Sequence, residues 1–230
     1  AELIKYASNS FLATKISFIN EIANLCEKTN INVEDISIGM GLDKRIGSRF
    51  LRAGPAYGGS CFPKDTRAIV NTAKKYKIDL SIIKSVIKSN KSRNKILLKK
   101  ITEILKNKLN NKKITFLGVT FKANTDDMRD SSSLVMIPFF SKKGAKIRYY
   151  DPTGYKKEFK KLNNVSYENN IKSAVINSDL IIIHTEWNDF KSINFKSLVK
   201  KKNFIIYDMR NIYSSQKMKQ EKIKYFSVGR

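Results

Sequence analysis

Apolar residues recur at helical spacing near the start of the chain. Between residues 3 and 26 they form two adjoining stripes on what reads as a single helix. The first stripe contains Leu3, Ala7, Phe11, Phe18, Ile22 and Leu25, and the second contains Leu12, Ile16, Ile19, Ala23 and Cys26. Apolar residues three or four positions apart are typical of an amphipathic helix, so two stripes predict a long helix that packs on more than one side.

Helical spacing continues in most of the chain up to about residue 110. The predicted elements are, in order, a short helix over 33–40, a loop rich in glycine and proline over 45–61, a helix that begins near Pro63, and a long helix over 81–109. Asn32 suits the N-cap of the short helix, and Gly39 and Gly41 are expected to end it.

After residue 110 the pattern changes to short apolar runs. These runs lie at 112–121, 145–151, 179–187 and 203–210, with helix-like stretches between them, notably at 131–143 and 188–201. Apolar runs that alternate with helices predict a parallel sheet with crossover helices. The predicted fold is therefore α/β, with a helical region over 1–110 followed by a Rossmann-like parallel α/β domain over 111–230.

The first of these runs lacks the glycine-rich signature of dinucleotide binding. GxGxxG is expected directly after such a strand, but the chain reads LGVTFKANTDD. A nucleotide site at the carboxyl ends of the strands stays open, because Asp151 and Asp208 end strands and Arg210 follows. Ordinary loop polarity explains the same residues equally well. His184 and Trp187, at another strand end, are interpreted as structural.

The formal net charge of +25 over 230 residues raises the question of an anionic partner. Lysines lie in nearly every segment, so we interpret most of them as solvated faces, with attraction of a phosphate-bearing ligand as the alternative. Two cysteines and one histidine predict neither a zinc site nor a disulfide framework. No apolar run reaches the roughly 18 residues of a membrane span, and we expect a cytoplasmic protein. The first residue is Ala1, so a piece of a longer protein is expected.

The stretch AYGGSCFPKD contains the strongest candidate nucleophile, Cys61. Gly58 and Gly59 let the backbone approach a ligand closely. A helix start directly after the cysteine, with Lys64 nearby, favours the ionised thiol, and Asp65 could direct a water molecule. The alternative is a small packed residue, which is our interpretation of Cys26.

The first helix supplies two polar candidates. Lys5 and Asn9 are four residues apart and therefore share a helix face. An ammonium and an amide on one face are what an oxyanion needs. A solvated helix end is the alternative.

Several motifs occur together in order: KYASNSFLATKISFINEIANLCE, GLDKRIGSRFLRAGPAYGGSCFPKDTRA, FLGVTFKANTDDMRDSSS, YDP, TEW and YDMRNIY. Over essentially the whole chain they resemble the central and C-terminal parts of UDP-glucose 6-dehydrogenases, in the UDP-glucose/GDP-mannose dehydrogenase family. The combination of GGSCFPKD with an upstream KxxxN is highly specific. The chain departs from the family at Ala56, where a glycine is usual.

This resemblance implies two successive oxidations of a nucleotide sugar at C6, with NAD as cofactor. By it, Cys61 captures the intermediate aldehyde and becomes acylated as a thioester, which water then releases. Lys5 and Asn9 would stabilise charge on the C6 oxygen, and Asp65 would position or activate the water.

The resemblance also implies binding residues. Substrate would be held by Arg45 from a neighbouring subunit and by Phe50, Leu51, Arg52, Tyr57, Gly58, Phe121 and Lys122. Lys64 and Arg129 would meet NAD, with Arg210 a weaker candidate. A homodimer through the first long helix is implied, with no nucleic acid or membrane partner.

The family's N-terminal NAD-binding domain has no counterpart in these 230 residues, so we expect this chain alone to bind NAD poorly and to turn over little. The alternatives are another nucleotide-sugar dehydrogenase, of the GDP-mannose or UDP-N-acetyl-hexosamine type, a non-catalytic scaffold, and a basic nucleic-acid-binding module.

Overall fold

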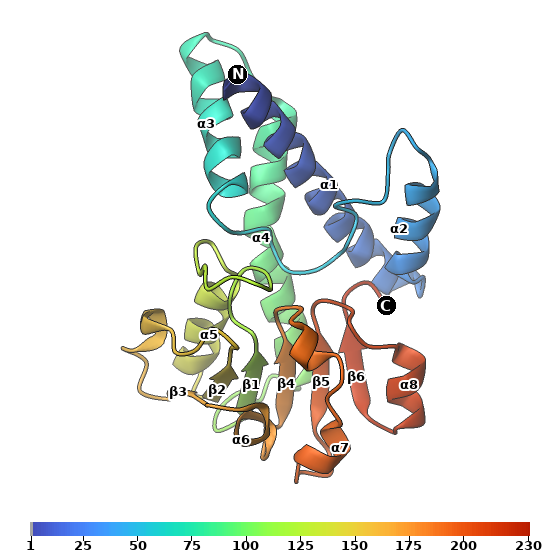
Figure 1. The fold of residues 1–230 in the computed structure, drawn as a ribbon, viewed down its shortest axis with the longest axis vertical. Coiled ribbons are helices and arrows are strands. Elements are labelled where there is room, and N and C mark those ends of the chain that lie inside the picture. The colour runs from blue at the N-terminus through green and yellow to red at the C-terminus, as the bar shows by residue number, and fades with distance from the viewer. Residues whose placement is uncertain (1) are drawn as a thin grey trace. The chain divides into compact units, whose positions relative to one another are not determined.

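The computed structural model describes residues 2–230 and divides them into two compact units (Figure 1). The first unit comprises the residues up to Ile96 together with Val228–Arg230, and the second comprises Leu97–Ser227. The boundary predicted from the sequence, residue 110, follows the last long helix, whereas the two units divide within that helix. Each unit is described by itself below.

The first unit is helical, as predicted. Its helices are α1 Glu2–Thr29, α2 Val33–Leu42, α3 Phe62–Lys75 and the first part of α4 Ser81–Ile104. Helix α4 ends five residues before the predicted position. Lys106 and Asn107 have φ of +54° and +59°, and this left-handed backbone cannot continue a right-handed helix.

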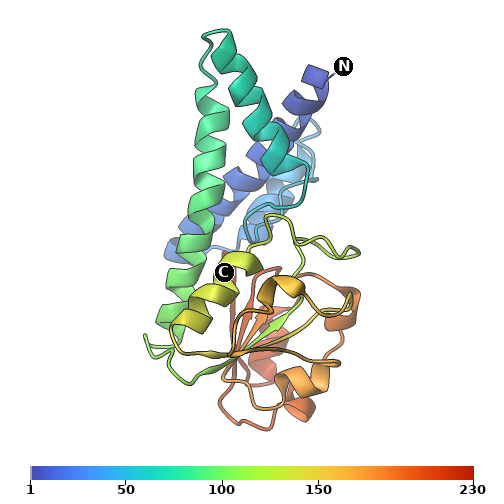
Figure 2. The same ribbon diagram turned by 90° about the vertical axis from the view of Figure 1, so that its left-hand side faces the viewer.

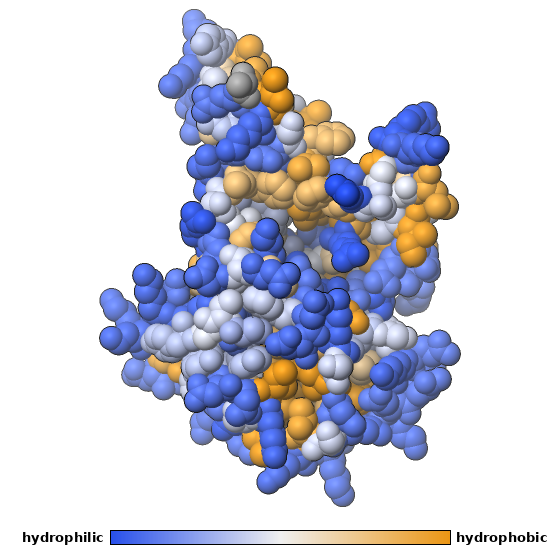
Figure 3. Space-filling model, viewed as in Figure 1, coloured by the Kyte–Doolittle hydropathy of each residue, from blue (hydrophilic) through white to orange (hydrophobic). Residues whose placement is uncertain are grey.

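Helix α1 packs only one of its two apolar stripes within this chain. Ile19, Ala23 and Cys26 of the second stripe are buried. Phe11 and Phe18 of the first stripe remain exposed, at 66% and 46%, and Figure 3 shows apolar surface along α1 and over α2. The prediction that both stripes pack is therefore not met by contacts inside this chain.

The predicted end of α2 is wrong, although its start is confirmed. Asn32 is the N-cap, and its side chain accepts a hydrogen bond from the Glu34 amide at 3.1 Å. Gly39 and Gly41 lie inside the helix, which ends at Leu42. Gly41 serves close packing instead, because a Cβ there would lie 3.0 Å from Ser48.

The second unit contains a six-stranded, fully parallel sheet. Its strands are β1 Lys113–Leu117, β2 Lys146–Tyr150, β3 Val165–Tyr167, β4 Leu180–Ile183, β5 Ile205–Asp208 and β6 Lys224–Ser227. The order is β3-β2-β1-β4-β5-β6, the doubly wound arrangement in which the strand order reverses between β1 and β4. The predicted parallel α/β fold is confirmed.

Short helices cover both faces of this sheet, which Figure 2 shows nearly edge-on. They are α5 Ser133–Lys142, α6 Ile171–Val175, α7 Phe195–Leu198 and α8 Ser215–Gln220, together with 3-10 turns at Lys157–Phe159 and Asn188–Phe190. The helix predicted over 188–201 is thus mostly loop, because Asn194 caps a new, four-residue helix inside it. The edge strands β3 and β6 were not predicted, because both are short and neither is a wholly apolar run.

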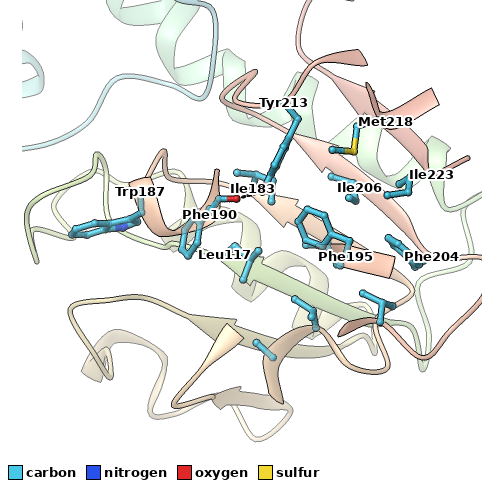
Figure 4. Packing of buried hydrophobic residues seen from close by; sticks show 14 residues of the cluster. Leu117, Ile183, Trp187, Phe190, Phe195, Phe204, Ile206, Tyr213, Met218 and Ile223 are labelled. Atoms are coloured by element: carbon cyan, nitrogen blue, oxygen red, sulfur yellow. Dashed lines mark hydrogen bonds between the residues drawn. The ribbon is translucent and has the colours of Figure 1, made fainter. Parts of the chain in front are cut away.

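Aromatic residues outside the strands complete the core on one face of the sheet. Leu117, Ile183 and Ile206 of three neighbouring strands are buried against Phe190 and Phe195 (Figure 4). Both phenylalanines come from the 188–201 segment, so this segment packs by its side chains although it is not a continuous helix.

Candidate functional site

Cys61 occupies the N-cap of α3, where its side chain is exposed. Its carbonyl accepts a hydrogen bond from the Asp65 amide at 2.8 Å, and its Sγ lies 3.6 Å from the Ser60 hydroxyl. Cys26, by contrast, is 1% exposed, and burial raises the pKa of its thiol. Of the two thiols, Cys61 is the one that a ligand can reach.

Asp65 is the buried acid of this site, with a side chain that is 0% exposed. Asn9 Nδ2 donates to its Oδ2 at 2.6 Å, and Lys64 Nζ lies 3.0 Å from its Oδ1. Burial alone would raise the pKa of Asp65, but the hydrogen bond from Asn9 and the pairing with Lys64 outweigh it and lower the pKa below its usual range. Asp65 therefore stays a carboxylate at neutral pH.

Packing of α1 against α3 brings the predicted catalytic residues together across 56 positions of sequence. Asn9 bonds Asp65 directly, and the charge of Lys5 contributes to lowering the Asp65 pKa. A carboxylate with a lowered pKa is a weak proton acceptor. The geometry thus suits Asp65 to orienting Asn9 or a water molecule more than to removing a proton.

Lys64, which the resemblance assigns to the cofactor, pairs with Asp65 in this chain. Its Nζ also lies 6.0 Å from the centre of the Tyr6 ring. It is an exposed cation at the first turn of α3, beside Cys61.

The predicted substrate loop lies directly before Cys61. Phe50 adopts φ of +66°, an uncommon conformation for a bulky residue. Its ring lies 6.0 Å from that of Phe62, which meets Tyr57 edge-on at 6.1 Å. Three aromatic side chains therefore form one cluster around Phe62, the residue that follows Cys61. The importance of Phe62 was not predicted from the sequence.

The remaining substrate candidates of this loop divide by exposure. Leu51 is buried, and its carbonyl accepts a hydrogen bond from Ser37 at 2.7 Å; Gly58 is also buried, while Arg52 is exposed. The sequence analysis also missed the side chains that hold the loop, because they are polar residues within helical stretches rather than parts of the loop motif.

Arg45 lies on an exposed turn rather than in the loop beside the cysteine. It pairs with Asp43 at 2.6 Å, and the turn is tied to α1 by Lys15, whose Nζ donates to the carbonyls of Ile46 at 2.8 Å and Gly47 at 3.1 Å. The Arg45 side chain is 90% exposed, as a contact to another subunit requires.

In the second unit, the predicted binding residues lie in the segment that follows β1. Lys122 Nζ lies 5.4 Å from the centre of the Phe121 ring. Arg129 binds Asp127 through two hydrogen bonds of 2.9 and 2.8 Å and is largely exposed. Both cations therefore lie after the carboxyl end of a central strand.

The other polar strand ends have partners inside the unit. Asp151 Oδ2 accepts the Val119 amide at 2.8 Å, and Arg210 Nε donates to the His184 carbonyl at 2.8 Å. His184 is fully buried, and burial lowers its pKa to about 3, with a smaller contribution from Arg210. Asp208 accepts the Arg210 amide at 2.9 Å. Of the two interpretations left open, these contacts support the structural one.

Gly118 packs closely against Thr185 at the point where the strand order reverses. Gly118 follows β1 with φ of +76°, and a Cβ there would lie only 2.4 Å from the Thr185 Cβ at the end of β4. In doubly wound folds a dinucleotide binds at this point, over a glycine-rich turn. The turn after β1 lacks GxGxxG, so the second unit has no glycine-rich dinucleotide turn of that kind.

Among residues 2–230, no helix combines the length and apolar character that crossing a membrane requires. The same residues contain no cluster of three or more histidine, cysteine or acidic side chains placed to hold a metal ion.

Comparisons with known proteins give consistent matches along the chain. Residues 1–92 match the model of the UDP-glucose/GDP-mannose dehydrogenase family, central domain, and residues 115–215 match the UDP binding domain of the same family. UDP-glucose 6-dehydrogenases of Rickettsia felis and Rhizobium meliloti are 46% and 42% identical over 100% of this chain, which covers 52% and 53% of their lengths. The chain thus spans about half the length of these curated relatives.

Solved structures agree with these matches. A UDP-glucose dehydrogenase from Pyrobaculum islandicum is 30% identical with a TM-score of 0.85, over 99% of this chain and 50% of that one. An NDP-N-acetyl-D-galactosaminuronic acid dehydrogenase from Methanosarcina mazei is 26% identical with a TM-score of 0.86, over 99% and 50%.

Proposed function

Because the chain belongs to the UDP-glucose/GDP-mannose dehydrogenase family, we propose that it is the thiol-bearing and nucleotide-sugar-binding part of an NAD-dependent UDP-glucose 6-dehydrogenase. The observation that carries the proposal is the exposed Cys61 thiol at the start of α3, one helical turn before the buried Asp65 carboxylate. The relatives named UDP-glucose 6-dehydrogenase support the choice of substrate.

The chemistry assigned to this chain's own residues is covalent capture. The Cys61 thiolate adds to the aldehyde carbon at C6 of the sugar, a C–S bond forms, and the former carbonyl oxygen takes the negative charge. Lys5 and Asn9 stabilise that oxygen from the α1 face. After oxidation to the thioester, water attacks the same carbon and the C–S bond breaks. The thiolate is restored, the sugar leaves as a carboxylate, and the two protons of the water pass to solvent.

Asp65 supports both stages without taking a proton permanently. Its carboxylate fixes the Asn9 amide at 2.6 Å and offers an acceptor to the attacking water. NAD, when bound, would supply the hydride acceptor for both oxidations. We assign its glycine-rich binding turn to a part of the protein outside this chain, because the second unit lacks GxGxxG after β1.

In the first unit, the loop before Cys61 is proposed to bind the nucleotide sugar. In the second unit, Lys122 is proposed to bind the nucleotide sugar and Arg129 to bind NAD. The UDP binding domain match over residues 115–215 supports this assignment. Phe50 and Tyr57 supply the apolar walls, and the exposed Arg45 reaches the site of a second subunit.

A homodimer is part of the proposal. Ile4, Phe11, Phe18 and Leu25 recur every seven residues on α1 and are exposed. Apolar side chains at this repeat form the seam between paired helices, and a patch of this kind needs a cover. The occupant that we propose is α1 of a second copy of this chain.

Ligand selectivity tests the function. Calorimetric titration of the purified chain is expected to give binding of UDP-glucose in preference to UDP alone and to GDP-mannose. The nucleic-acid alternative, which rests on the charge of +25, predicts instead that single-stranded RNA binds with an affinity that falls steeply with salt. RNA binding that weakens steeply with salt, together with no binding of UDP-glucose, would overturn the proposal.

A second candidate deserves a parallel titration. The Methanosarcina neighbour is a dehydrogenase of an N-acetylated nucleotide sugar and has a similar TM-score. Preference for a UDP-N-acetyl-hexosamine over UDP-glucose would shift the substrate assignment while keeping the thiol chemistry.

A further inference from the structure

The loop that leads to Cys61 is buried although it is irregular. Most residues from 53 to 59 are buried, yet none of them lies in a helix or a strand. Buried backbone N–H and C=O groups need partners. Whatever supplies these partners therefore determines the path of the loop.

Asn90 of α4 bonds both backbone groups of one loop residue, Tyr57. Its Oδ1 accepts the Tyr57 amide at 2.8 Å, and its Nδ2 donates to the Tyr57 carbonyl at 3.0 Å. The side-chain amide thus provides the two hydrogen bonds that a neighbouring strand would provide to this residue in a sheet. Tyr57 lies four residues before Cys61, so the clamp acts close to the thiol.

Asn20 of α1 and Arg93 of α4 hold the beginning of the same loop. Asn20 Oδ1 accepts the Gly54 amide at 2.8 Å, and Arg93 Nε donates to the Gly54 carbonyl at 3.0 Å. Asn20 Nδ2 also reaches the Pro55 carbonyl at 3.4 Å. Five backbone groups of the loop are therefore bound by three side chains.

These side chains are themselves held rigidly. Asn20 and Arg93 are 4% and 3% exposed. Arg93 Nη1 donates to Asn24 Oδ1 at 2.7 Å and to the Asn20 carbonyl at 3.3 Å. A planar guanidinium that bonds two helices and the loop leaves little freedom to any of them.

We propose that Asn90, Asn20 and Arg93 are positioning residues for the Cys61 site: they set the path of the loop at 54–60, and through it the sugar-binding wall and the thiol. This inference rests on the function proposed above. It assigns the polar residues of α1 and α4 a role beyond the stability that any buried hydrogen bond provides.

The test compares Asn90→Ala with Asn94→Ala in the 230-residue chain. Asn94 lies one helical turn further along α4, and its side chain has no hydrogen bond to the loop in the described structure. Hydrogen exchange of the 54–60 amides, UDP-glucose affinity and the rate of Cys61 alkylation by iodoacetamide are measured on folded protein, at matched fractions folded.

Asn90→Ala is expected to lose exchange protection in the loop and to bind UDP-glucose roughly tenfold or more weakly, because small misplacements of binding groups are costly. Its alkylation rate changes several-fold, whereas Asn94→Ala stays close to the unchanged chain in all three measurements. If Asn90→Ala lost exchange protection in the loop but kept its UDP-glucose affinity and its Cys61 alkylation rate, Asn90 would only stabilise the fold. That result would overturn the inference.

Arg93→Lys decides the matter if Asn90→Ala does not fold. Lysine keeps the charge but cannot bond Gly54 and Asn24 together, so weaker UDP-glucose binding with faster loop exchange is expected. Unchanged UDP-glucose binding with an unprotected loop would again overturn the inference.

Failure of the proposed function would give a different result. The unchanged chain would then not bind UDP-glucose, while exchange and Cys61 alkylation would still decide whether Asn90 positions the loop.

Discussion

At the scale of single residues, the ionisation of Asp65 depends on its burial and on two partners, its sequence neighbour Lys64 and Asn9, which lies 56 positions away. Burial opposes its charge, and Asn9 and Lys64 restore it. The same spacing of lysine, asparagine and aspartate in an extended chain would leave the carboxyl with its ordinary pKa. The acid is therefore a property of helix packing as much as of sequence.

Asp65→Asn is expected to destabilise the chain by about 1–2 kcal/mol at pH 7, because a charged hydrogen bond is lost. Since the folded pKa of Asp65 is lowered, its stabilisation is complete above the unfolded value of about 3.9 and is lost as pH falls through the folded value. Urea unfolding of both proteins at pH 7 and near pH 3 measures this. If Asp65→Asn lowered the free energy of unfolding equally at both pH values, the stabilising role of the carboxylate would be contradicted.

At the scale of elements, Gly118 determines how closely the turn after β1 packs against the residues that follow β4. The glycine follows β1, and the Thr185 side chain lies where a Cβ of residue 118 would be. The segment that follows then leads to Lys122 and Arg129 instead of a phosphate-binding turn.

Gly118→Ala is expected to lower the free energy of unfolding by about 3 kcal/mol, from the left-handed backbone and the clash with Thr185 together. Gly154→Ala is the matched control in the same unit. Its φ is +86° but no atom lies within 4 Å of the added Cβ, so only the backbone cost of about 1 kcal/mol is expected. Equal losses in urea unfolding would show that the Thr185 contact is unimportant.

The exposed stripe of α1 makes a second prediction for an element. Phe18→Glu is expected to weaken self-association by about 2 kcal/mol, because a charge would enter an apolar seam. Ile82→Glu, at a 71% exposed position on α4, serves as the control and should leave association unchanged. Analytical ultracentrifugation over a concentration series measures both. An unchanged chain that stays monomeric throughout would refute the dimer.

At the scale of the whole molecule, the chain combines a thiol site in one unit with a doubly wound sheet in the other, and neither carries GxGxxG. It spans about half the length of the curated relatives it matches.

We expect the purified 230-residue chain to form no detectable NADH from UDP-glucose and NAD, while it still binds UDP-glucose. Absorbance at the NADH band, with calorimetry on the same sample, checks both halves. Measurable NADH formation that disappears in Cys61→Ser would contradict the assignment of NAD binding to another part of the protein.

The sequence by itself determined the elements with strong periodic patterns and the candidate thiol. The long helices, four of the six strands and the parallel α/β class follow from local apolar spacing, because burial imposes that spacing on each element separately. Cys61 and Asp65 also stand out locally, through the glycines, the helix start and their separation of one turn.

Only the tertiary structure decided which polar residues work together and which apolar faces are covered. Asn9 meets Asp65 and Asn90 meets Tyr57 across 56 and 33 positions, and no periodicity encodes such pairs. The edge strands, the interrupted 188–201 segment and the exposed stripe of α1 were likewise decided by packing. The physical reason is that a side chain's partner depends on how helices and strands pack, whereas its periodic position depends only on its neighbours in sequence.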